Sequence, residues 1–165
     1  MIKNVKVLVL TLLLAAASCS FTTSDEDPGK DKVLVSLISY VLEKGHYDAK
    51  EFNDAFSEEV FDDFVTSLDP LKRYFLKSDI KEFEAYKTQI DDQIRNEDIS
   101  FFDLAYTRLR ERMEESKAIY AEVLETPFDY SKQESIDTDY ENLDYAKNQK
   151  ELKERWANQM KFNTI

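Results

Sequence analysis

The sequence predicts an all-α domain of about five helices in an irregular bundle, with an extended aromatic-rich arm before the last helix. Apolar residues recur at steps of three and four along most of the chain, which is the spacing of one face of a helix. The periodic segments end at residues that interrupt helices, namely Gly45, Pro70 and Pro127. These patterns place the helical domain at residues 32–165.

Residues 1–18 are predicted to be a signal peptide. Lys3 and Lys6 form a short positive start, and residues 7–17 are apolar except for Thr11. A helix of that length spans about 16 Å, well short of the roughly 30 Å hydrocarbon core of a bilayer. The segment is therefore predicted to be a removable export signal and not a membrane-spanning helix.

Cys19 is the only cysteine of the chain and directly follows Ala16, Ala17 and Ser18, where a bacterial lipobox places its lipidated thiol. We expect lipidation at Cys19, which would anchor the chain to a membrane. The alternative is ordinary signal cleavage after Ala17, which would leave a free thiol near the new N-terminus. Residues 19–31 are polar and acidic with a Pro–Gly break, so they are predicted to form a flexible acidic tether.

The first two helices are predicted over about residues 32–44 and 48–68. Gly45 supplies the stop of the first helix, and Asp48 is the expected N-cap of the second. The second helix ends before Pro70, because proline disfavours helical geometry in the preceding residue. The apolar residues at helical spacing are Val33, Leu34, Leu37, Ile38, Val41 and Leu42, then Phe52, Phe56, Val60, Phe61, Phe64, Val65 and Leu68.

A compact connection over residues 71–76 leads to the next two predicted helices. The third is capped by Ser78 or Asp79, and the fourth covers about residues 100–124 with Ser116 as the one polar gap in its apolar face. The apolar residues expected to face inward from the third helix are Ile80, Phe83, Ile90 and Ile94. A solvated flank of the fourth helix is predicted at Arg108, Arg112 and Glu115.

Residues 128–147 are aromatic but follow no helical period. We predict an extended arm whose aromatic side chains hold it across other helices. A last helix is predicted from Asn148 onward, because the segment Asn-Gln-Lys-Glu resembles a capping box. The aromatic residues of the arm are Phe128, Tyr130, Tyr140 and Tyr145, and the apolar residues of the last helix are Leu152, Trp156, Met160 and Phe162.

The chain lacks the residues that most enzymes combine. His46 is the only histidine, and a turn position favours an exposed or capping role. Gly29 and Gly45 are the only glycines, which excludes glycine-rich phosphate loops and nucleotide-binding fingerprints. The lysines lie on charged helix faces, where they stay protonated. We therefore predict no catalytic residue and no cofactor site in this chain.

Acidic residues dominate the charge, which is formally −12 at pH 7. Such a surface repels phosphate backbones, so nucleic acid is not expected as a partner. One histidine cannot supply the paired Glu-x-x-His motifs of a di-iron bundle, and residues 137–141 lack the glycine of a calcium loop, so no metal is expected. The adjacent carboxylates are predicted to be solvated helix surface. They are Asp62–Asp63, Asp91–Asp92 and Glu114–Glu115.

Three segments carry a resemblance to a known family. Residues 67–80 contain Leu-Asp-Pro, then an aromatic pair, then Ser-Asp-Ile leading into a helix. Residues 100–103 read Ser-Phe-Phe-Asp before an arginine-rich helix, and residues 152–156 read Leu-Lys-Glu-Arg-Trp. By the order and spacing of these segments, residues 32–165 resemble the N-terminal helical region of the tail-specific, or carboxy-terminal processing, serine peptidases of bacterial envelopes.

The resemblance implies a parent enzyme that cleaves envelope proteins from their C-terminal tails, with a PDZ domain and a Ser–Lys core after this region. No position here matches the catalytic motif of that family. The resemblance thus implies a non-catalytic scaffold and adaptor- or substrate-docking domain, truncated before the PDZ domain. Its implied partners are the PDZ–peptidase core, an adaptor protein and the membrane through Cys19. Its implied location is the periplasmic side of the bacterial envelope, as an outer-membrane lipoprotein.

An independent helical lipoprotein that acts as a protein-binding module is the alternative. The two hypotheses differ in what they require. A peptidase scaffold requires a PDZ domain and a peptidase core encoded just downstream, whereas an independent module requires a folded monomer with a defined partner.

Overall fold

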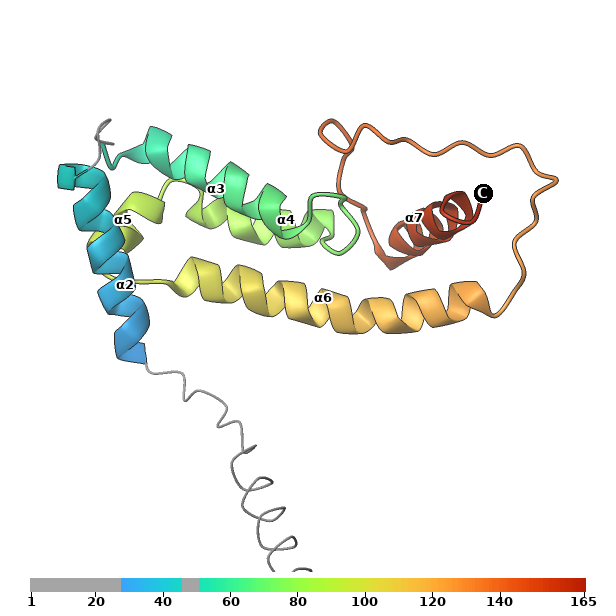
Figure 1. Ribbon diagram of the computed structural model, residues 1–165, viewed down its shortest axis with the longest axis horizontal. Helices are drawn as coiled ribbons and strands as arrows, with labels where there is room; N and C mark the ends of the chain where they lie inside the picture. Colours follow the sequence, from blue (N-terminus) through green and yellow to red (C-terminus); the bar gives the residue numbers. More distant parts are fainter. Residues whose placement is uncertain (1–27, 46–50) are drawn as a thin grey trace, which may run out of the picture. The chain divides into compact units, whose positions relative to one another are not determined.

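The computed structural model describes residues 28–45 and 51–165, and in these two ranges it is all-α, as predicted. The only β-type pairing there is an isolated parallel bridge between Leu76 and Ala146. No helix in the same ranges combines the length and apolar character needed to cross a bilayer. The elements in Figure 1 are α2 (Pro28–Tyr40), the π-helical turn η1 (Val41–Gly45), α3 (Asp54–Leu68), α4 (Lys77–Phe83), the 3-10 turn η2 (Glu84–Tyr86), α5 (Ile90–Arg95), α6 (Ser100–Leu124) and α7 (Gln149–Phe162).

Helix α2 confirms the first predicted helix but begins earlier, at Pro28. Proline is favoured at the first helical position, where its missing N–H would have no partner in the helix. The apolar side chains of α2 are largely exposed: Val33 by 67%, Leu37 by 57% and Ile38 by 56%. Periodicity thus located the helix, but it did not show whether its apolar side is covered.

Helix α3 begins at Asp54, later than predicted, and Asn53 is its N-cap: the Asn53 side chain accepts a hydrogen bond from the backbone N–H of Phe56 at 3.0 Å. The predicted cap Asp48 lies outside the described residues, as do Cys19 and His46. Phe61 and Val65 are the most buried apolar residues within α3. They belong to a first core cluster of buried residues that also contains Phe75, Phe83, Ile90, Phe101 and Ala105.

The predicted third helix is divided into α4, η2 and α5, so the prediction of one continuous helix was wrong. Backbone bonds of the tighter i→i+3 type, such as Gln89 N–H to Tyr86 C=O at 2.9 Å, interrupt the α-helical pattern. The interruption lets α5 pack against α3. Ser57 Oγ donates to Asp91 Oδ1 at 2.6 Å and accepts from the backbone N–H of Asp91 at 2.9 Å.

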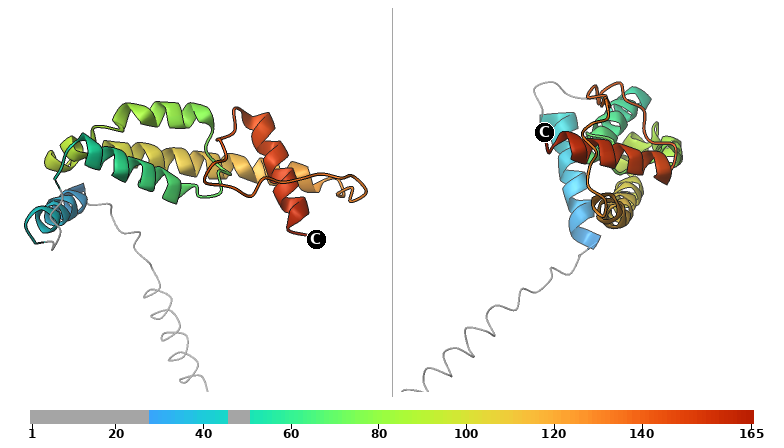
Figure 2. Two further views of the ribbon diagram at one scale, coloured as in Figure 1. Left: turned by 90° about the horizontal axis from the view of Figure 1, so that it is seen from above. Right: turned by 90° about the vertical axis from the view of Figure 1, so that its right-hand side faces the viewer.

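Helix α6 has the predicted bounds and contributes to both core clusters. Phe101 and Ala105 near its start lie in the first cluster, and Ile119 and Val123 near its end lie in the second. Helix α7 lies across the C-terminal half of α6 (Figure 2). The buried residues of the second cluster are Leu76, Ile119, Val123, Ala146 and Leu152.

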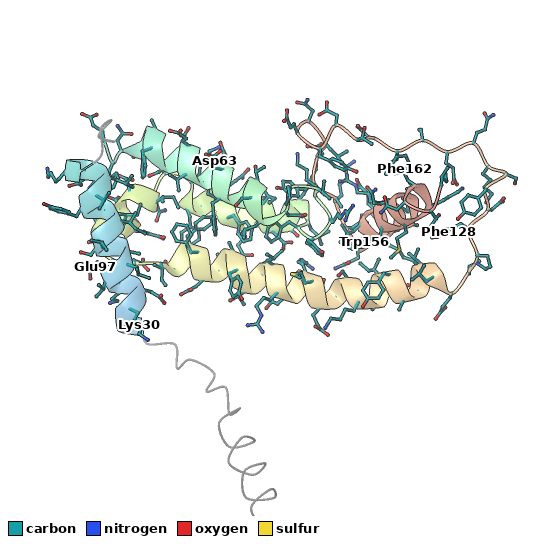
Figure 3. All side chains as sticks on the ribbon, in the orientation of Figure 1. Lys30, Asp63, Glu97, Phe128, Trp156 and Phe162 are labelled. Atoms are coloured by element: carbon teal, nitrogen blue, oxygen red, sulfur yellow. The ribbon has the colours of Figure 1, made fainter. Side chains whose placement is uncertain are left out.

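The arm between α6 and α7 is irregular, as predicted, and its aromatic residues hold it against α7. Tyr140 donates its hydroxyl hydrogen to Gln159 Oε1 at 2.6 Å, and Phe128 packs on the second cluster. Figure 3 shows Phe128 on the arm, with Trp156 and Phe162 on α7. Asn148 caps α7 as predicted, since its side chain accepts from the backbone N–H of Glu151 at 3.0 Å.

Candidate docking groove

The loop of residues 69–76, between α3 and α4, is organised by the carboxylate of Asp69. One oxygen accepts from the backbone N–H of Arg73 at 2.8 Å, and the other from those of Tyr74 at 2.8 Å and Phe75 at 2.9 Å. Asp69 is only 1% exposed, so these three N–H groups take the place of water. The loop includes Lys72 at φ 49°, a left-handed conformation that is uncommon for residues with a side chain.

Replacing Asp69 with Asn is expected to lower the free energy of unfolding by about 1–3 kcal/mol. The amide of Asn keeps one oxygen as an acceptor, but its NH₂ group is a donor that faces backbone N–H groups and cannot accept from them. Urea unfolding at neutral pH, followed by circular dichroism, measures the loss. Asp139→Asn is the matched control, since that exposed carboxylate also accepts from a backbone N–H, that of Asn142. The control should show no measurable change. Equal losses in the two variants would contradict the role given to Asp69.

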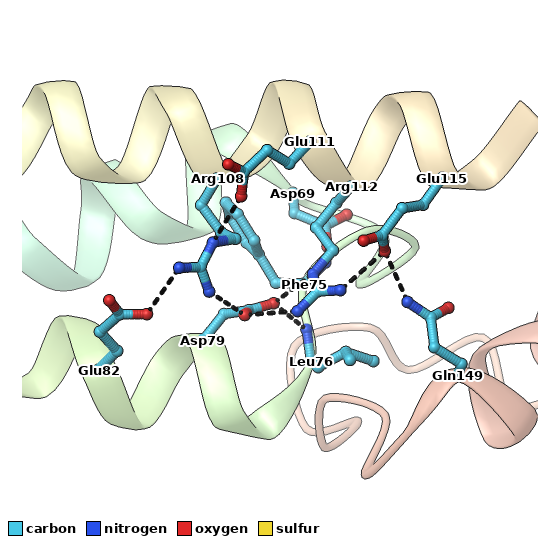
Figure 4. A network of polar contacts seen from close by, with 10 residues as sticks. All are labelled: Asp69, Phe75, Leu76, Asp79, Glu82, Arg108, Glu111, Arg112, Glu115 and Gln149. Carbon is cyan, nitrogen blue, oxygen red and sulfur yellow. Dashed lines mark hydrogen bonds and ion pairs between the residues drawn. The ribbon is translucent and has the colours of Figure 1, made fainter.

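The carboxylate of Asp79 is fully buried and binds two arginines of α6 (Figure 4). Oδ1 accepts from Arg108 Nη1 at 2.7 Å and from Arg112 Nη2 at 2.8 Å. Oδ2 accepts from Arg112 Nε at 2.9 Å and from the backbone N–H of Leu76 at 2.9 Å. Four donors therefore satisfy this carboxylate and join the start of α4 to the middle of α6.

Arg108 and Arg112 were predicted to line a solvated flank, and that prediction was wrong. Their side chains are only 24% and 14% exposed. Residues four apart share one side of a helix, so both arginines reach Asp79 from α6. Glu115, the third residue of that flank, accepts from Arg112 at 2.7 Å and from Gln149 at the start of α7 at 2.6 Å. The polar network therefore extends from α4 through α6 to α7.

This network changes the protonation of Asp79. Burial by itself would raise the pKa of Asp79, but hydrogen bonds from Arg112, the Leu76 N–H and Arg108 outweigh burial and lower that pKa. A carboxyl group with a lower pKa in the folded state stabilises the fold above its unfolded pKa of about 3.9. That stabilisation is lost as the pH falls through the folded-state value.

The difference in free energy of unfolding between the native chain and an Asp79→Asn variant should therefore depend on pH. We expect it to be constant above about pH 5 and to shrink as the pH falls below about 4, where Asp79 takes up a proton in the unfolded chain but is still ionised in the folded chain. Urea unfolding at a series of pH values measures the difference. If this difference in free energy stayed the same down to the most acidic pH at which the chain folds, it would contradict the conclusion that Asp79 is ionised in the folded chain.

A groove lies between the loop of residues 69–76, the arm and α7, and we call it the docking groove. It consists of two adjoining cavities of about 110 Å³ and about 290 Å³, which share Ser135, Ile136 and Asn158. The first cavity is also lined by Leu71, Lys72, Arg73, Asp137, Tyr140, Leu143, Arg155, Trp156 and Gln159. The second is also lined by Tyr130, Lys132, Glu134, Lys161, Phe162 and Ile165.

The paired carboxylates are exposed as predicted, except for Asp91. This residue is 4% exposed, and besides Ser57 it binds Arg95 at 2.7 Å, so its prediction as solvated surface was wrong. Within residues 28–45 and 51–165, no group of three or more His, Cys, Asp or Glu side chains is arranged to hold a metal.

Comparison with known proteins assigns this fold to a family. Residues 38–165 match the family described as "Tail specific protease N-terminal domain". The chain belongs to this family. A tail-specific protease of Haemophilus influenzae is 30% identical over 127 residues, which cover 75% of this chain. The chain spans 18% of the length of that relative.

The motif residues of this tail-specific protease domain have structural roles. Asp69 of Leu-Asp-Pro holds the loop, and Asp79 of Ser-Asp-Ile holds two arginines of α6. Trp156 of Leu-Lys-Glu-Arg-Trp donates its indole N–H to the carbonyl of Arg73 at 2.9 Å. The pairing of Asp79 with the arginines was not predicted from the sequence. The four-residue spacing of Arg108 and Arg112 was the one signal available in the sequence. It indicates that the two arginines share one side of a helix, but not which carboxylate they bind.

Proposed function

We propose that this chain is the non-catalytic N-terminal scaffold and docking domain of an envelope carboxy-terminal processing serine peptidase. Membership of the tail-specific protease family supports the proposal that the parent enzyme is such a peptidase. The network around Asp79 supports the scaffold role, because it joins α4, α6 and α7 through buried, charge-assisted hydrogen bonds. The docking groove beside this network supports the docking role.

A binding experiment with the peptidase part of a tail-specific protease tests the proposal. The purified chain should bind a PDZ–peptidase fragment that lacks its own N-terminal domain, and by itself it should cleave no protein with an exposed C-terminal tail. Calorimetry and a gel-based cleavage assay measure the two properties. Cleavage by the pure chain, or a stable monomer with no affinity for the peptidase part, would contradict the proposal.

We propose further that Cys19 carries a lipid and that the mature chain is an outer-membrane lipoprotein facing the periplasm. The short apolar leader and the single cysteine after Ala-Ala-Ser support this location. Mass spectrometry of the N-terminal peptide from a bacterial host should show a diacylglyceryl group on Cys19. A Cys19→Ser variant should leave the membrane fraction, and an unmodified Cys19 in the native chain would refute the anchor.

A further inference from the structure

We propose that the docking groove binds a short extended peptide of a partner protein through a Glu or Asp side chain, with Arg73 as the carboxylate receptor. This assignment rests on the proposed docking function and specifies the chemistry of the ligand. Four features of the groove carry it: the unpaired guanidinium of Arg73, its fixed backbone, the local positive charge and the apolar lining.

Arg73 lies in the first cavity without a carboxylate partner. Its Nε is buried and has no hydrogen-bond acceptor, and no ion pair with Arg73 occurs in the described part of the chain. The guanidinium lies over the ring of Trp156, with 5.8 Å from Cζ to the ring centroid. A guanidinium has five N–H donors, and none of those of Arg73 has an acceptor in the described part of the chain, so a carboxylate brought by a ligand can pair with it. By contrast, Arg95, Arg108, Arg112 and Arg155 all form ion pairs with carboxylates.

The backbone of Arg73 is fixed from both sides before any ligand arrives. Its N–H donates to Asp69 Oδ1 at 2.8 Å, and its carbonyl accepts from Trp156 Nε1 at 2.9 Å. The neighbouring Lys72 donates through Nζ to the carbonyls of Glu141 at 3.1 Å and of Leu143, which joins the loop to the arm. A receptor held in this way loses little further freedom on binding.

The groove is positive on a strongly acidic protein. Five cationic side chains and two carboxylates line its two cavities, whereas the whole chain has a formal net charge of −12. Three of these cations already pair with carboxylates, Lys132 with Asp129, Arg155 with Glu151 and Lys161 with Glu134. Among the described residues that line the groove, the positive charge without an ion pair belongs to Lys72 and Arg73, and it favours an anionic ligand there. The cations are Lys72, Arg73, Lys132, Arg155 and Lys161, and the carboxylates are Glu134 and Asp137.

The apolar lining of the groove favours a peptide as the ligand. Leu71, Ile136, Leu143 and Trp156 line the first cavity, whose volume of about 110 Å³ suits one side chain and is too small for a helix. Phe162 and Ile165 line the second cavity and are 52% and 91% exposed. An extended segment with one carboxylate between apolar residues matches this alternation of charge and apolar surface.

Intrinsic fluorescence offers a direct test, because Trp156 is the only tryptophan of the chain and lines the groove. A short acetylated and amidated peptide, with Glu between Leu and Ile residues, is titrated into the native chain. A second peptide has Gln in place of Glu. The Glu peptide is expected to change the fluorescence and to bind about tenfold more tightly than the Gln peptide, the difference of a charge-assisted hydrogen bond.

The Arg73→Gln variant should lose the preference for Glu, while Arg110→Gln should keep it. Arg110 is a matched control, since it also lies over an aromatic ring, that of Tyr106, and has no ion pair within the described residues. Circular dichroism and urea midpoints confirm that both variants fold. Equal binding of the two peptides, or an unchanged preference in Arg73→Gln, would overturn the assignment. So would binding only of a peptide whose single carboxylate is its own C-terminus.

Association with the peptidase part is measured in parallel, so that the two proposals can fail separately. Failure of the peptide experiment together with binding of the peptidase part overturns only the groove assignment. If the peptidase part displaces the Glu peptide, the groove belongs to the parent enzyme, and the assignment to a partner protein is wrong.

Discussion

Replacing Asp79 with Asn is expected to lower the free energy of unfolding by about 3–5 kcal/mol at neutral pH. The variant removes the negative charge that pairs with both Arg108 and Arg112. The two arginines stay on α6, and the buried carboxylate no longer balances their positive charge. The hydrogen bonds to Asp79 are the main reason that the pKa values of both arginines are raised, and without that carboxylate the arginines still stay charged, because a guanidinium is not deprotonated in proteins. Urea unfolding followed by circular dichroism measures the loss.

Glu111→Gln is the control for this variant. Glu111 also accepts a hydrogen bond from Arg108, at 3.0 Å, but its side chain is 58% exposed. An exposed ion pair contributes little, so the control should lose less than about 1 kcal/mol. Similar losses in Asp79→Asn and Glu111→Gln would show that burial of Asp79 has no bearing on the strength of the network.

Replacing Phe101 with Ala is expected to cost about 3–5 kcal/mol, because it leaves a cavity in the first core cluster. Phe101 is fully buried, and rings on three other segments surround it. Its ring centroid lies 5.2 Å from that of Phe61, 5.5 Å from that of Tyr86 and 6.0 Å from that of Phe83. Thermal and urea unfolding should both show a less stable domain.

Tyr106→Ala on the same helix separates this packing effect from a change in helix propensity. Both variants replace an aromatic residue of α6 with Ala, but Tyr106 is 55% exposed and lies outside the core clusters. The control should therefore change stability by less than about 1 kcal/mol. If Tyr106→Ala were as unstable as Phe101→Ala, Phe101 would not be the centre of the core.

Local patterns were enough to locate most helices. The spacing of apolar residues predicted a helix over about residues 100–124, where α6 lies, and the Asn148 signal predicted the start of α7. Both depend on interactions between residues three or four apart, which a sequence displays directly. The continuous third helix was predicted incorrectly because its apolar spacing persists across the turn at residues 87–89. Packing of α5 against α3 through Ser57 and Asp91 accompanies that interruption.

The all-α class, the irregular arm and the resemblance to tail-specific peptidases could be predicted from local residue patterns. The burial of particular charges and the position of the groove depend on how the helices pack against one another. Asp79 meets Arg108 and Arg112 across 29 and 33 positions of the chain, and Arg73 meets Trp156 across 83. Helical periodicity describes which side of one helix a residue occupies. It does not say which distant element faces that side, and the partner of a buried charge depends on that element.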